Sequence, residues 1–178
     1  MTIELNLKDH IRTIPDFPKP GIRFRDITPL LADPVAYGSV IRQLAERFRD
    51  QGVDVVASVE ARGFLFGAPL ALELQSRFVP VRKPGKLPFQ TRSHSYQLEY
   101  GEDTLEVHTD AVLEGERVLV VDDLLATGGT VAACNSLVQQ AGGRIIGCAF
   151  VIELTDLEGR AALEGFEVIS LVSYSEDE

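Results

Sequence analysis

Two adjacent acids, Asp122 and Asp123, follow the apolar run 117–121 and come just before the turn Thr-Gly-Gly-Thr at 127–130. A glycine turn that opens a helix presents backbone N–H groups and the positive end of the helix dipole, so it suits a phosphate. Carboxylates repel phosphates, but they accept hydrogen bonds from sugar hydroxyls or bind a cation. A ligand with hydroxyls in its middle and a phosphate at its end satisfies both groups.

The turn taken alone is a weak signal, because short glycine motifs match by accident. It is not a Walker loop, since no Gly-Lys-Ser or Gly-Lys-Thr follows it. Paired acids after an apolar strand also occur in phospho-accepting receiver domains, but there they lie near the start of the chain and no Gly-Gly-Thr follows. The complete string of strand, acids, turn and apolar helix therefore favours a site for a phosphorylated sugar.

The elements that must position this stretch alternate between strands and helices. A helix is predicted between Asp33, its N-cap, and Gly52, its stop, with Pro34 as the first residue. A strand, a turn, a helix and a strand follow at 53–59, 60–63, 64–75 and 77–82, and the same order returns over 117–154. Two such units predict an α/β fold, with a central, mostly parallel twisted sheet flanked by helices and a site at the carboxyl ends of the strands.

Composition limits the class of protein. The 178 residues, 45% of them hydrophobic, suit a single domain spanning 1–178. A net charge of -10 argues against nucleic acid and anionic membranes as partners. Cys134 and Cys148 lie in apolar segments and the first residues are charged, which predicts a reduced, cytoplasmic protein that does not span a membrane.

Several longer strings carry a resemblance to a known family: DFPKPGIRFRDITPLL, EARGFLFGAPLA, VRKPGKLP, SYQLEYG and VIELTDLEGR, in addition to the acids and the turn. Together they cover about residues 11–172, and the chain resembles the type I phosphoribosyltransferases. FRDIT and LEYG are typical of the adenine-using members. The resemblance implies transfer of ribose 5-phosphate from phosphoribosyl diphosphate to adenine, giving AMP and diphosphate with Mg²⁺ present. It also implies a homodimer, a small N-terminal base-binding hood at 1–33 and a flexible lid loop at 84–106.

The same resemblance assigns roles to the opening stretch. Asp122 and Asp123 would bind the ribose hydroxyls, and Asp122 would help to place Mg²⁺. Negative charge there would also stabilise a ribose that becomes oxocarbenium-like. The 5'-phosphate would be held by Ala126, Thr127, Gly128, Gly129 and Thr130.

Cations for the diphosphate come from a locally basic window, because 74–98 contains no acid. The alternative is a solvated basic loop, which is the commoner meaning of a charge run. The resemblance favours diphosphate binding, in part across a subunit interface, by Arg62, Arg82, Lys83 and Lys86.

The base would be held by the string GIRFRDIT. Phe24 would stack on the purine, backbone atoms of Arg23 would pair with its edge, and Arg25 would close the pocket. Leu124 and Leu154 would line it. Arg23 replaces the aliphatic residue expected there, but a role carried by the backbone survives that change.

The long polar segment that contains LEYG is predicted to form the lid. Glu99 would exchange a proton with the purine at N7, and Tyr100 would cover the site and exclude water.

Two alternative functions stay open: a transferase for hypoxanthine or xanthine, and a regulatory module that binds phosphoribosyl diphosphate without catalysing a reaction. The second needs a DNA-binding extension and a basic surface, whereas this chain is acidic.

Overall fold

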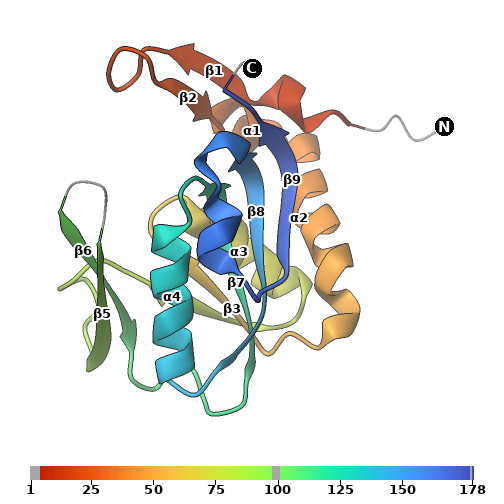
Figure 1. Ribbon diagram of the computed structural model, residues 1–178. Helices are drawn as coiled ribbons and strands as arrows, with labels where there is room; N and C mark the ends of the chain where they lie inside the picture. Colours follow the sequence, from red (N-terminus) through yellow and green to blue (C-terminus); the bar gives the residue numbers. More distant parts are fainter. Residues whose placement is uncertain (1–4, 98–100, 177) are drawn as a thin grey trace.

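A five-stranded parallel sheet forms the centre of the molecule, in the order β4-β3-β7-β8-β9. The computed structural model describes residues 5–97, 101–176 and 178. The strands are β3 (Val55–Val59), β4 (Arg77–Val81), β7 (Arg117–Leu125), β8 (Arg144–Leu154) and β9 (Val168–Tyr174). Figure 1 shows their carboxyl ends gathered at the edge where α4 begins. The predicted α/β fold is confirmed.

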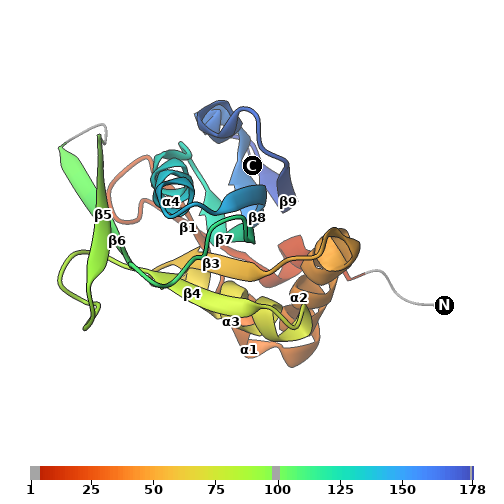
Figure 2. The ribbon, with the colours of Figure 1, turned by 90° about the horizontal axis from the view of Figure 1, so that it is seen from below.

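Helices cover both faces of this sheet, as Figure 2 shows. One face carries α1 (Thr28–Ala32), α2 (Pro34–Phe48) and α3 (Gly63–Glu73), and the other carries α4 (Gly129–Gln140). The predicted cap of α2 is confirmed, because the Asp33 carboxylate accepts hydrogen bonds from the N–H groups of Val35 and Ala36. A short 3₁₀ turn, η2 (Arg49–Gln51), follows α2 and ends at Gly52 in the left-handed region. The buried side chains accordingly form two apolar clusters, one on each face.

The N-terminal part lies beyond the carboxyl ends of the central strands. A 3₁₀ turn, η1 (Leu7–His10), precedes an antiparallel hairpin of β1 (Arg12–Pro15) and β2 (Arg23–Asp26). Two further 3₁₀ turns, η3 (Thr155–Leu157) and η4 (Gly159–Leu163), connect β8 to β9 on the same edge. The hairpin and these turns therefore flank the edge at which the site was predicted.

The segment 84–106, predicted to be a lid loop, contains two strands in its described part. β5 (Thr91–Gln97) and β6 (Glu102–His108) form an antiparallel hairpin in regular register from Thr91↔His108 to Gln97↔Glu102. Leu105 and Val107 alternate with polar residues and are buried in the apolar cluster that also contains the buried side chains of α4. Their period of two fits a strand with one covered face, which the polar composition of the segment obscures. Residues 98–100, including the predicted lid residues Glu99 and Tyr100, lie outside the described residues.

Strand β7 is longer than the sequence predicts. It continues through both acids to Leu125, because β8 extends beside it and pairs Asp122 with Phe150 and Leu124 with Ile152. Both acids therefore lie within the last residues of β7 rather than after the strand.

Across the described residues, every helix is too short or too polar to cross a bilayer.

Candidate active site

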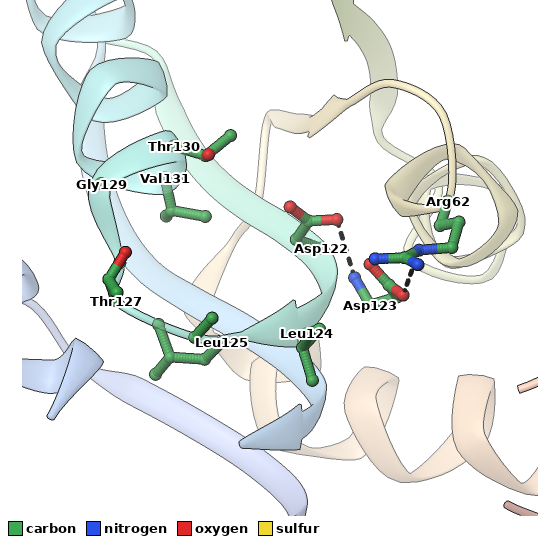
Figure 3. A pocket seen from close by; sticks show the side chains of 11 residues that line it. Arg62, Asp122, Asp123, Leu124, Leu125, Thr127, Gly129, Thr130 and Val131 are labelled. Atoms are coloured by element: carbon green, nitrogen blue, oxygen red, sulfur yellow. Dashed lines mark hydrogen bonds and ion pairs between the residues drawn. The ribbon is translucent and has the colours of Figure 1, made fainter. Parts of the chain in front are cut away.

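The turn from β7 into α4 has the geometry of an anion site. Gly128 adopts φ 82° at the N-cap of α4, and the helix begins at Gly129. This conformation favours glycine and leaves the first N–H groups of α4 without a side-chain cap. Figure 3 shows Thr127 and Thr130 on this turn, with the cleft between them and the acids.

The two glycines of the turn have different surroundings. A Cβ on Gly128 would lie 2.4 Å from the carbonyl oxygen of Gly159, so Gly128 is packed against η4. A Cβ on Gly129 would meet only Tyr96, at 3.9 Å. Gly128 therefore shapes the turn, whereas Gly129 faces open space.

An ion pair holds η4 in place behind the turn. The guanidinium of Arg160 donates two hydrogen bonds of 2.7 Å to the two carboxylate oxygens of Glu153. Hydrogen bonding from Arg160 lowers the pKa of Glu153 against the effect of burial. This bidentate pair fixes η4, whose Gly159 packs closely on the glycine turn, since a Cβ there would lie 2.1 Å from the carbonyl oxygen of Ala126.

The paired acids form the opposite wall of the cleft. Asp123 is buried, and its Oδ2 forms an ion pair with Nε of Arg62 at 2.7 Å. Oδ1 of Asp122 accepts from the N–H of Asp123 at 2.9 Å, and Figure 3 shows both contacts. Burial and the charge of Asp123 raise the pKa of Asp122 well above its usual range. Burial also raises the pKa of Asp123, although Arg62 opposes this. A positively charged group next to Asp122 and Asp123 would therefore be stabilised by their carboxylates.

A close approach of two backbones places Arg62 beside these acids. A Cβ on Gly63, the first residue of α3, would lie 2.8 Å from Oδ1 of Asp122 and 3.2 Å from the carbonyl oxygen of Val121. Glycine is therefore required at this position, directly after Arg62. The peptide bond between Glu60 and Ala61, on the same turn, is cis.

Together these groups line one cleft of about 200 Å³, from Arg62 on one side to the segment 122–131 on the other. Within the described part of the chain, no group of three or more His, Cys, Asp or Glu side chains could hold a metal by itself. Mg²⁺ is commonly bound by one or two carboxylates together with substrate phosphates, so Asp122 and Asp123 fit a metal shared with a ligand.

The basic residues after β4 are organised by a carboxylate that the sequence reading missed. Glu60, at the end of β3, accepts hydrogen bonds from Nζ of Lys86 at 2.8 Å, the N–H of Lys83 at 2.6 Å and Nη2 of Arg82 at 3.2 Å. Burial alone would raise the pKa of Glu60, but these three donors outweigh it and lower the pKa to about 2. Glu60 thus fixes the loop 82–86.

A second set of contacts joins that loop to the phosphate turn. Lys83 forms an ion pair with Asp103 of β6, and the hydroxyl of Tyr96 donates to the same carboxylate at 3.2 Å. The Tyr96 hydroxyl also lies 3.3 Å from Oγ1 of Thr130. The β5–β6 hairpin is therefore attached to both anion-binding segments. No sequence signal marks Tyr96 or Asp103, because their partners are distant in the chain.

The β1–β2 hairpin brings an aromatic ring close to Arg62, although this ring does not itself line the cleft. Phe24 is partly buried, packs edge to face against Phe17 at 5.1 Å between centroids, and lies 5.7 Å from Cζ of Arg62. Arg23 pairs with Pro15 across the hairpin, and proline has no N–H, so β1 gives the carbonyl of Arg23 no ladder hydrogen bond. That carbonyl can accept from a ligand.

Arg25 departs from the role that the resemblance implies. Its side chain is 8% exposed, lies over the ring of Tyr174 at 3.9 Å from the centroid, and donates to Oγ1 of Thr13. It does not line the cleft. The physical reason is the position of β9, whose last residue offers a buried aromatic face to the guanidinium.

Comparison with known proteins decides the family. The phosphoribosyl transferase domain matches residues 27–170. An adenine phosphoribosyltransferase of Serratia proteamaculans is 60% identical over 95% of this chain and 86% of its own length. The chain belongs to the adenine phosphoribosyltransferase family. Its fold agrees with crystal structures of adenine phosphoribosyltransferases from Thermoanaerobacter pseudethanolicus (56% identity, TM-score 0.92, covering 94% and 98% of the two chains) and Saccharomyces cerevisiae (40%, 0.88, 93% and 96%).

The fold brings some of the predicted adenine phosphoribosyltransferase site residues into one cleft and leaves others outside its lining. The cleft unites Arg62 with the acids, Leu124 and the whole turn Ala126 to Thr130. Leu154 is partly buried at the end of β8 and packs on the apolar cluster that also includes Leu124. Arg82, Lys83 and Lys86 stand outside the lining, on the loop anchored by Glu60.

Proposed function

We propose that this chain transfers the 5-phosphoribosyl group of phosphoribosyl diphosphate to N9 of adenine, giving AMP and diphosphate in purine salvage. The observation that carries the proposal is the single cleft in which two buried acids face a glycine turn at a helix N-terminus. Family membership supports the reaction, and the yeast relative was crystallised with an imino-altritol bisphosphate and adenine.

The two walls of the cleft divide the sugar phosphate between them. The N–H groups at the start of α4 and the hydroxyls of Thr127 and Thr130 hold the 5'-phosphate. Asp122 and Asp123 accept hydrogen bonds from the ribose hydroxyls. As the bond to diphosphate lengthens, the ribose gains positive charge, and the acids stabilise it more than they stabilise the neutral sugar.

The diphosphate is held by Arg62 and by the loop 82–86. Arg62 is 47% exposed while bonded to Asp123, so part of its guanidinium remains accessible to an anion. Arg82, Lys83 and Lys86 supply further charge, with their loop fixed by Glu60. Mg²⁺, held by Asp122 together with the substrate oxygens, would neutralise charge on the diphosphate.

The base occupies the side of the cleft nearest the β1–β2 hairpin. Phe24 stacks on the purine, Leu124 and Leu154 supply apolar contacts, and the unpaired carbonyl of Arg23 accepts from the amino group of adenine. Residues 1–33 form the hood over this site. The segment 84–106 forms the lid, on which Glu99 exchanges a proton at N7 and Tyr100 excludes water.

The protein acts as a homodimer in the cytoplasm. An apolar surface on α3 supports self-association: Leu65 and Leu72 are 39% and 81% exposed and lie seven residues apart, on one face of the helix. The partner subunit would complete the diphosphate site. Cys134 and Cys148 are buried and free, as expected for a reducing compartment.

Incubation with phosphoribosyl diphosphate, Mg²⁺ and each purine base in turn tests the proposal. Adenine should give AMP. Hypoxanthine presents a carbonyl acceptor where adenine has an amino donor, and an N–H donor where adenine has the N1 acceptor. Each mismatched buried group costs roughly 1 to 3 kcal/mol. Two mismatches should lower its kcat/KM by about two to four orders of magnitude. Efficient use of hypoxanthine or xanthine would identify a different transferase, and binding without turnover would identify a regulatory module.

A further inference from the structure

The segment that follows β9 contacts the β1–β2 hairpin. The guanidinium of Arg23 donates to the carbonyl oxygen of Glu176, and the guanidinium of Arg25 lies 3.9 Å from the centroid of the Tyr174 ring. Figure 1 shows the C-terminal end beside β1. The residues on either side of Phe24 are therefore both attached to the segment 174–176.

The same segment contacts the turn that follows β8. Oγ1 of Thr155 donates to the carbonyl oxygen of Tyr174 at 3.1 Å, and the carboxylate of Asp156 accepts from the N–H of Glu176. These two residues come directly after Leu154, in η3. Glu176 thus joins two elements through its backbone: its carbonyl accepts a hydrogen bond from the hairpin, and its N–H donates one to η3.

One contact of this connection is buried, whereas the two hydrogen bonds of Glu176 are exposed. Tyr174 is 6% exposed and Arg25 is 8% exposed, so the stacked pair is packed and largely removed from water. Lys8 adds a second cation over the Tyr174 ring, at 4.6 Å from its centroid. Cation–π contacts strengthen as they are desolvated, which favours one position of the segment.

We propose that the segment 174–176 is a strap that fixes the distance between the two walls of the base site, with Arg23, Thr155 and Asp156 as positioning residues. The inference rests on the proposed function, in which Phe24 and Leu154 contact the purine from the hairpin and from the end of β8. A gap of 0.5 to 1 Å forfeits roughly a quarter to a half of a dispersion contact. A fixed separation is therefore needed for tight contact with a flat base.

Steady-state kinetics of Arg23→Leu and Asp156→Ala test the strap. Each variant should raise KM for adenine by about ten- to a hundredfold, the scale of a misplacement of about 1 Å. KM for phosphoribosyl diphosphate should stay within about twofold of wild type, because the cleft is lined by Arg62 and the segment 122–131 and not by the strap. Arg12→Leu is the matched control, since it removes an exposed arginine of the same hairpin that points to Asp26 instead.

The double variant separates a strap from two independent defects. Arg23 and Asp156 form no ion pair with each other among the described residues, so independent effects on KM would multiply. If both act through Glu176, the double variant should match the weaker-binding single variant within about twofold. Thr155→Val, which removes only the hydroxyl bond to Tyr174, replaces Asp156→Ala if that protein does not fold.

Two results would overturn the strap while leaving the proposed function intact: effects that multiply, or KM for phosphoribosyl diphosphate that rises as much as KM for adenine. Wild-type protein that makes no AMP from adenine would overturn the proposed function and this inference with it.

Discussion

The two glycines of the phosphate turn can be separated experimentally, although from the sequence they look equivalent. Gly129→Val should fold with little change in melting temperature, because its Cβ meets only Tyr96, at 3.9 Å. It should nevertheless lose AMP binding, since the side chain fills the space that a phosphate would occupy. Thermal unfolding with and without AMP measures both effects. Stabilisation of Gly129→Val by AMP would show that the phosphate binds elsewhere.

Gly128→Val is the contrasting variant and should lose stability as well as binding. Its φ of 82° disfavours a side chain by roughly 1 to 2 kcal/mol, and its Cβ would lie 2.4 Å from the Gly159 carbonyl. A lower melting temperature without AMP is therefore expected for this variant alone. Equal melting temperatures for the two variants would contradict the packing of Gly128 against η4.

Glu99 carries the chemistry assigned to the lid, and truncating it tests that role. Glu99→Ala should lower kcat by about a hundred- to ten-thousandfold, the usual contribution of a general acid or base, with smaller changes in substrate affinity. Glu102→Ala is the control, because it removes an exposed carboxylate from the start of β6. An unchanged kcat in Glu99→Ala would remove this residue from the mechanism.

At the scale of elements, Glu60 connects the end of β3 to the basic loop 82–86. Glu60→Gln should lower the free energy of unfolding at pH 7 by about 1.5 to 3 kcal/mol, the usual value for hydrogen bonds to a charged group. It should also raise KM for phosphoribosyl diphosphate, because the loop loses its anchor. Glu73→Gln is the control, since it removes a surface carboxylate that pairs with Arg49 and is 41% exposed.

The pH dependence of that difference follows from the lowered pKa of Glu60. Its pKa falls from a usual value of 4.5 to about 2. A lowered carboxyl pKa stabilises the fold fully above the unfolded value and loses that effect as pH falls through the folded value. Urea unfolding should thus show a constant difference between wild type and Glu60→Gln above about pH 5, shrinking as pH falls from 4.5 toward 2. A difference that grows on acidification would contradict this ion-pair geometry.

At the scale of the whole molecule, the exposed apolar face of α3 predicts the mode of self-association. Leu72→Glu should convert the proposed dimer to a monomer, because it would bury a carboxylate in the proposed apolar contact. Sedimentation velocity at micromolar concentration gives the oligomeric state. Leu157→Glu is the control, with a leucine 46% exposed on η3. A monomeric wild type, or a dimeric Leu72→Glu, would contradict the use of this face.

The negative net charge of the whole molecule conceals a local group of exposed basic side chains. The chain carries a net charge of -10, yet its cleft and the adjoining loop expose Arg62 and Lys86 at 47% each. Each is held by a buried carboxylate, Asp123 or Glu60. An acidic protein thereby keeps a local cationic surface, which suits the proposed binding of diphosphate.

Features that depend on neighbours along the chain could be predicted from the residues alone. The cap at Asp33, the apolar periodicity of α2 and the strands around the turn are set by residues a few positions apart, and the structure confirms them. The acids and the glycine turn are also close in sequence, so one stretch was enough to predict that they would line a common cleft. Longer strings identified the family.

Features that depend on residues brought together by folding could not be predicted in this way. Glu60 binds Lys86 across 26 positions, and Arg23 meets Glu176 across 153, so no local pattern marks either contact. The β5–β6 hairpin and the extension of β7 through Asp123 arise because a paired strand satisfies their backbone groups, whatever their local composition. Periodicity reports which face of a segment is buried, whereas pairing across the fold decides how far a strand runs and which charges meet.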